Sequence, residues 1–103
     1  MSEKNIIKRK IIEAIESDQL SKDSINKASL FGSFLYGTES KESDVDLVVE
    51  LNPSTPIGFF KLAHIRRNLE SFIGRKVDLL TPDAMSPYFR NNVLIEAESI
   101  YER

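Results

Sequence analysis

The sequence contains no cysteine and no long apolar run. Without cysteine there is neither a disulfide bond nor a thiolate metal site, which is typical of a protein kept in a reducing cytoplasm. No stretch approaches the ~20 consecutive apolar residues of a membrane span. The polar segment 5–10 (NIIKRK) interrupts any signal-peptide core. We therefore expect a soluble cytoplasmic protein with no membrane partner.

Positive charge is scarce for a nucleic-acid-binding protein. The chain has 14 Lys and Arg against 16 Asp and Glu, a net charge of −2 at pH 7. Because affinity for nucleic acid comes largely from Lys and Arg neutralising phosphates, we expect no direct contact with nucleic acid. The first helix carries a basic cluster, which is interpreted as a solvated face. Its members are Lys4, Lys8, Arg9 and Lys10. His64 is the only histidine, and it is interpreted as a solvated residue rather than a general base.

The remaining composition is that of a globular protein. With 103 residues, 41% hydrophobic and 29% charged, we expect one domain over residues 1–103. Periodicity and turn residues predict an α/β fold. The expected elements are helix 3–17, loop 18–23, strand 25–31, a short helix closing at Gly37, strand 45–51, helix 58–73 capped by Gly74, strand 76–81, and a last helix from Ser86-Pro87 that includes Ile100 and Tyr101.

Two carboxylates interrupt the predicted strand 45–51 and its approach. Alternation along the strand places Asp44 and Asp46 on the same face. Like charges about 4 Å apart repel by roughly 4 kcal/mol at an effective dielectric constant near 20. The presence of two neighbouring carboxylates on one face therefore requires an explanation. A divalent cation such as Mg²⁺, which takes oxygen ligands, is the simplest one.

A Gly-Ser turn precedes these carboxylates. Gly32 would let a ligand approach the backbone closely, and Ser33 would present a hydroxyl and free N–H groups to an anion. Phosphate on one side and metal carboxylates on the other define a site for a nucleoside triphosphate. Taken singly, a Gly-Ser pair is most often a turn and an Asp-x-Asp pair a solvated strand face.

Taken together, Gly32-Ser33, the segment 34–43 and Asp44-Val45-Asp46 resemble the signature of the DNA polymerase β-like nucleotidyltransferases. The pattern is most similar to the minimal nucleotidyltransferase (MNT) family. The resemblance implies the minimal nucleotidyltransferase fold, a small mixed sheet of about three to four strands flanked by helices. It also implies a third carboxylate, Asp78, on a neighbouring strand. Asp44, Asp46 and Asp78 would be the catalytic residues and would hold two Mg²⁺ ions, with Asp78 the candidate to take the acceptor's proton. Gly32 and Ser33 would bind the β and γ phosphates of ATP.

The resemblance also implies a partner. MNT proteins typically act as antitoxins that transfer AMP from ATP to a Tyr hydroxyl of a HEPN-domain RNase toxin. We expect the same AMPylation here, and self-association stays open. One alternative is a non-catalytic antitoxin that masks the toxin. Another is a small nucleotidyltransferase with a non-protein acceptor.

Other residues carry narrower expectations. Phe34 and Tyr36 are expected to pack beneath the turn. Phe59 and Phe72 are expected on the apolar stripe of helix 58–73. Arg66 and Arg67 on the same helix are candidates for meeting an acidic partner or a phosphate, and Asp83 is assigned to a turn rather than to the metal site.

Overall fold

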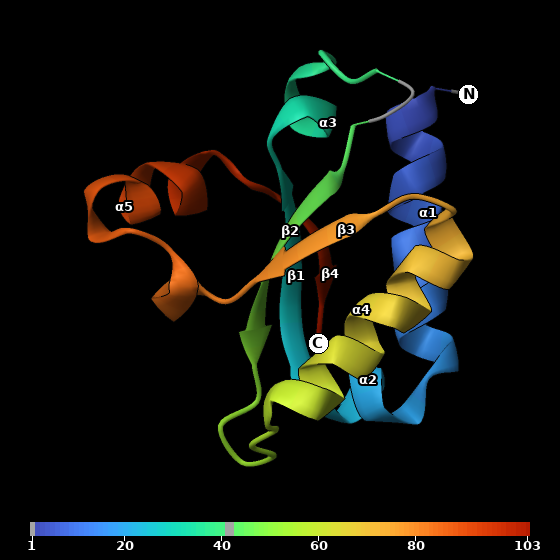
Figure 1. Cartoon of the computed structure of the whole chain (residues 1–103), viewed down its shortest axis with the longest axis vertical. Coiled ribbons are helices and arrows are strands. Elements are labelled where there is room, and N and C mark those ends of the chain that lie inside the picture. Colours follow the sequence, from blue (N-terminus) through green and yellow to red (C-terminus); the bar gives the residue numbers. More distant parts are fainter. Residues whose placement is uncertain (1, 41–42) are drawn as a thin grey trace.

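The structure, a computed structural model, describes residues 2–40 and 43–103 (Figure 1). In chain order its elements are α1 (Glu3–Ser17), α2 (Gln19–Ser24), β1 (Ile25–Phe31), α3 (Ser33–Tyr36), β2 (Val45–Leu51), α4 (Phe59–Ile73), β3 (Val77–Leu80), the 3₁₀ turn η1 (Pro82–Ala84), α5 (Pro87–Glu96) and β4 (Glu98–Glu102). The predicted α/β class and mixed sheet are confirmed. None of the helices in the described ranges is long and apolar enough to span a bilayer.

The four strands form one sheet in the order β3-β2-β1-β4. β1 pairs antiparallel with both β2 and β4, whereas β2 and β3 are parallel. A parallel pair needs a crossover, and α4 supplies it. Figure 1 shows α1 and α4 together on one side of the sheet, with α5 projecting from the other side.

The core lies between the sheet and the pair of helices α1 and α4. Ile7, Ile11 and Ile15 recur at helical spacing in α1, and Ile65, Leu69 and Ile73 do so in α4. The sheet contributes alternate residues, so that one face is apolar. The remaining members of the cluster are Ala14, Ile25, Ala28, Leu30, Phe34, Val45, Leu47, Val49 and Val77. By contrast, α5 buries none of its own residues.

The structure corrects two predicted elements. The expected loop 18–23 is mostly helical, because the Asp18 side chain caps α2 by accepting a hydrogen bond from the Ser21 backbone N–H at 3.1 Å. The expected closing helix ends at Glu96, and Ile100 and Tyr101 lie in β4. β4 satisfies the backbone groups along the outer edge of β1. Pairing with that edge outweighs the local helical spacing.

The basic cluster of α1 is partly engaged by β4. Lys4 and Lys8 both form ion pairs with Glu98, the first residue of that strand. Hydrogen bonds donated by Lys4, the larger contribution, and by Lys8 lower the pKa of the Glu98 carboxyl below its usual value. The interpretation of this cluster as a solvated face was therefore incomplete, since it also ties α1 to the last strand.

Three aromatic residues expected in the core are at the surface instead. Phe59 is 79% exposed, Tyr36 61% and Phe72 38%. In the four-residue helix α3 only Phe34 faces inward, while the hydroxyl of Tyr36 donates a hydrogen bond to Glu96. The buried row of α4 starts at Ile65, so Phe59 lies beyond the region that α1 and the sheet cover.

Phe34 should be the most costly of these aromatics to truncate. Its ring is fully buried, and the Arg75 guanidinium lies 5.0 Å from the ring centroid. We expect Phe34→Ala to lower the free energy of unfolding by about 3–5 kcal/mol, the usual cost of emptying a buried ring site. Urea unfolding measures this. Tyr36→Ala is the control at an exposed position, and an equal loss in both variants would contradict the packing described here.

Candidate active site

The Gly-Ser turn lies at the end of β1, directly before α3. Gly32 has φ +76° and ψ −150°, a backbone conformation essentially reserved for glycine. A Cβ atom added there would lie 2.1 Å from Oδ2 of Asp46. Ser33 is the first residue of α3, which ends at Gly37 in the left-handed conformation, as predicted. Position 32 therefore requires glycine for two reasons. Its φ is positive, and the Asp46 carboxylate occupies the space where a side chain would begin.

The three predicted carboxylates lie at the same end of two neighbouring strands. Asp46 in β2 and Asp78 in β3 are register partners of the parallel pair, so their side chains share one face of the sheet. Asp44 lies two residues before Asp46, beyond the buried Val45. The structure thus places Gly32, Asp46 and Asp78 in a row across the ends of β1, β2 and β3.

Electrostatic coupling among the carboxylates is concentrated on Asp46. Its pKa is raised above the ordinary Asp value, first by burial and then by the negative charges of Asp78 and Asp44. The ionised triad is therefore repulsive, and a divalent cation would relieve that repulsion.

The donor set suits magnesium, which binds carboxylate oxygens and completes its shell with water or phosphate oxygens. However, within residues 2–40 and 43–103 no three His, Cys, Asp or Glu side chains are close enough together to hold a metal ion as they stand. One or two of these carboxylates with phosphate oxygens fit the ion better than a preformed protein cage.

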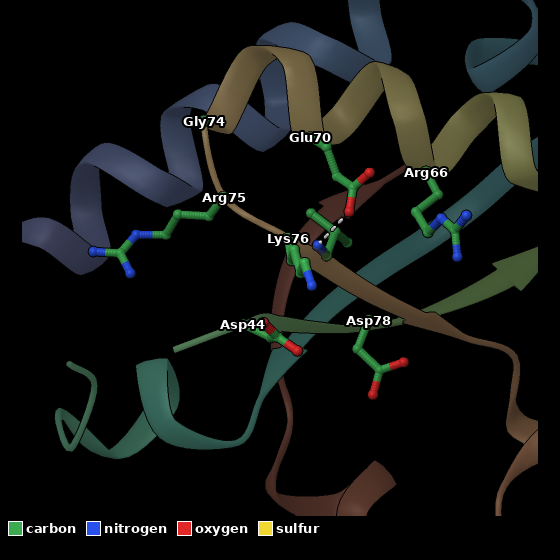
Figure 2. Close-up of a pocket in the computed structure, with 8 residues that line it drawn as sticks. Asp44, Arg66, Glu70, Gly74, Arg75, Lys76 and Asp78 are labelled. Carbon is green, nitrogen blue, oxygen red and sulfur yellow. Dashed lines mark hydrogen bonds between the residues drawn. The ribbon is translucent and has the colours of Figure 1, made fainter. Parts of the chain in front are cut away.

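A hollow of about 600 Å³ opens beside the carboxylates, between α4 and the start of β3. Figure 2 shows Arg66 and Glu70 reaching down from α4, with Asp44, just before β2, and Asp78, in β3, below them. Lys76 lines the same hollow, whereas Arg67 does not. Of the two arginines singled out in the sequence, only Arg66 thus borders it.

Two residues that the sequence analysis did not single out organise this region. Glu70 accepts a hydrogen bond of 3.0 Å from the Val77 backbone N–H, which fixes α4 to the start of β3 (Figure 2). Arg75 donates to the carbonyls of Ser40 and Ser43 and lies 3.3 Å from a carboxylate oxygen of Glu3. Arg75 therefore links the segment before Asp44 to α1. No local pattern marks these residues. Glu70 acts across the junction of two consecutive elements, and Arg75 acts on segments at least 32 residues away.

His64 and Asp83 lie outside this cluster. His64 is exposed on α4 as expected, with Nε2 3.3 Å from the carboxylate of Asp18. Asp83 is an exposed residue of η1, in agreement with its assignment to a turn. Neither residue lines the hollow.

Comparison with known proteins identifies the family of this chain. Residues 8–100 match the family model described as a nucleotidyltransferase domain. The chain belongs to the nucleotidyltransferase family. It is an enzyme of that family and acts on a nucleotide substrate.

Relatives and solved structures agree with this assignment. A Methanocaldococcus jannaschii protein named "putative protein adenylyltransferase" is 32% identical over 93% of this chain and 96% of its own length. A structure described as a "putative minimal nucleotidyltransferase" shares the fold with a TM-score of 0.69 and 27% identity, covering 94% of each chain. A chain from a toxin–antitoxin structure with AMP-PNP has a TM-score of 0.73 at 21% identity, covering 93% of this chain and 73% of that one. At 21% identity, the similarity to this last structure is evidence for a shared fold alone.

The turn of the nucleotidyltransferase offers a direct test of the Gly32–Asp46 contact. We expect Gly32→Ala to lower the free energy of unfolding by at least 1–3 kcal/mol, because it combines backbone strain with displacement of the Asp46 carboxylate. Gly37→Ala is a matched control. Gly37 also has a positive φ (+71°), but an added Cβ meets nothing within 4 Å. Equal losses in the two variants, measured by urea unfolding, would show that the carboxylate does not occupy this space.

The raised pKa of Asp46 predicts how stability depends on pH. The folded state holds this proton at higher pH than the unfolded chain, so ionised Asp46 destabilises the fold at neutral pH. That destabilisation fades as pH falls through the raised pKa toward the ordinary value of 3.8. Asp46→Asn should therefore gain most over wild type near pH 7 and least near pH 3.

The measurement is urea unfolding from pH 3 to 8 with EDTA present. Asp83→Asn, at an exposed carboxylate outside the cluster, controls for the general effect of removing one negative charge. A gain for Asp46→Asn that grows as pH falls would contradict the assigned electrostatics.

Proposed function

We propose that this nucleotidyltransferase transfers AMP from ATP to a Tyr hydroxyl of a partner HEPN-domain RNase toxin, with Asp44, Asp46 and Asp78 as its catalytic carboxylates. The observation that carries the proposal is the row formed by Gly32, Asp46 and Asp78 across adjacent strand ends. It supports a phosphate site and an acceptor site on opposite sides of one carboxylate. This is the arrangement that an in-line displacement needs.

In this proposal the backbone N–H groups and hydroxyl at Gly32 and Ser33 hold the β and γ phosphates. Asp44, Asp46 and Asp78 would hold two Mg²⁺ ions, which would supply charge neutralisation for the transfer. Asp78, on the outer strand, accepts the proton from the phenolic hydroxyl. The phenolic oxygen forms a bond to the α-phosphorus, the bond from that phosphorus to the β-phosphate bridge breaks, and pyrophosphate leaves.

A protein acceptor is supported by the exposed apolar surface. Tyr88 is 96% exposed and Ile95 80%, both on α5, and Phe59 and Phe60 are exposed at the start of α4. Exposed apolar side chains gathered on one element are characteristic of protein–protein contact. Related folds have been described in toxin–antitoxin complexes, which supports a toxin as the partner.

The same surface favours one competing function. A non-catalytic antitoxin would use the apolar side chains of α5 to mask the toxin, and it would need no metal. A substitution at Asp46 can separate these functions, because its carboxylate lies against Gly32 at the turn before α3 and is not one of the exposed apolar side chains of α5.

Adenylylation of the partner distinguishes the two functions. Incubation with ATP, Mg²⁺ and the co-purified toxin should raise the toxin's intact mass by one or more AMP units. Asp46→Asn should slow this transfer by ~10³-fold or more, a barrier increase of roughly 4 kcal/mol, while the complex still forms. Asp83→Asn is the matched carboxylate control and should transfer normally.

If the toxin mass never changes and Asp46→Asn still suppresses its RNase activity as well as wild type, the masking function is correct and the enzymatic proposal is wrong.

A further inference from the structure

Two cationic side chains border the hollow without a partner of their own. Within residues 2–40 and 43–103, neither the Arg66 guanidinium nor the Lys76 amine has an ion pair or hydrogen bond, and both residues are exposed. The other charged residues of the hollow between α4 and β3 are engaged or belong to the site. Glu70 is bonded to Val77, Arg75 to α1 and the segment before β2, and Asp44 and Asp78 belong to the carboxylate row. The two unpaired cations are thus available to a ligand that enters here.

The place of the hollow relative to the carboxylates identifies the kind of ligand. The proposed phosphate site is at the end of β1, and the hollow opens at β3, on the other side of Asp46. In an in-line displacement the entering group approaches the phosphorus opposite the leaving pyrophosphate. The hollow therefore lies on the side from which an acceptor approaches.

An apolar groove extends the hollow along α4. Phe59, Leu62, Ala63 and Leu79 line it, and Arg66 borders both spaces. The groove has a volume of about 100 Å³, enough for one apolar side chain rather than a base and its sugar. At the neighbouring edge of β3 the Val77 N–H already bonds to Glu70, so an incoming strand cannot pair with it.

We propose that this hollow is the acceptor site and that it takes a protein segment with an acidic side chain next to the reacting hydroxyl. Arg66 and Lys76 pair with the acidic group, and an apolar side chain of the same segment enters the groove. Charge complementarity supports this occupant, because two unpaired cations beside the carboxylates attract an acidic segment that an acidic protein would otherwise repel. The inference rests on the proposed function and adds the sequence context of the acceptor.

Three synthetic nine-residue peptides test the proposal. Each carries an N-terminal fluorophore, one central Tyr and a Leu, and the Tyr is flanked by Asp, Gln or Lys. Fluorescence anisotropy measures their binding to the full chain in Mg²⁺ with an ATP analogue that has a methylene group between its α and β phosphates. Transfer cannot occur, so the readout is binding alone.

Wild type should bind the Asp peptide about tenfold more tightly than the Lys peptide. Arg66→Glu with Lys76→Glu should abolish or reverse this preference. Lys61→Glu with Arg67→Glu makes the same charge change on exposed residues of α4 that do not line the hollow, and should retain it. Should the first double variant fail to fold by circular dichroism, Arg66→Gln with Lys76→Gln replaces it and should abolish the preference.

The inference is overturned if wild type binds all three peptides equally, or if both charge-reversed variants lose the preference alike. It is also overturned if the Arg66 and Lys76 changes weaken only the ATP analogue, since the cations would then serve the triphosphate. Failure of the proposed function looks different. With ATP the toxin would gain no mass, while the Asp peptide would still bind through Arg66 and Lys76.

Discussion

The contact between the Gly32 backbone and the Asp46 carboxylate is the constraint on which the rest of the site depends. It joins the end of β1 to β2 where a side chain would ordinarily separate them. Because β2 pairs in parallel with β3, fixing Asp46 also fixes Asp78. The turn, the two strands and the crossover helix α4 therefore position the candidate site as one unit.

This closeness has an energetic cost. Burial and two like-charged neighbours raise the pKa of Asp46, so the ionised site opposes folding at neutral pH. The hydrophobic core beneath it, built from α1, α4 and the inner face of the sheet, has to offset that opposition. The fold thus combines a stabilising apolar face with a polar edge at which like-charged carboxylates repel one another.

Local patterns in the sequence predicted the elements that hold the site, but not those that depend on a distant partner. The alternation around Asp46 and the Gly32-Ser33 pair identified β2 and the turn, because both are local signals. The helical spacing that extended the expected last helix to Ile100 and Tyr101 was misleading, since β4 forms by pairing with the free edge of β1. Similarly, Glu70 and Lys76 acquire meaning only when α4 is placed over β3. The metal-ligating and catalytic roles of the carboxylates stay predictions.

The two sides of the carboxylate row differ in how freely they can change. At position 32 no side chain is tolerated, because the Asp46 carboxylate occupies the space beside the backbone. The residue at this point of the turn therefore cannot vary. Arg66 and Lys76 are exposed and hold no other part of the described fold in place. Replacing them would alter the surface without disturbing the core. A lineage, or a designer, could thus vary what reaches the β3 side while leaving the β1 side untouched, and the scaffold could acquire new recognition properties one surface residue at a time.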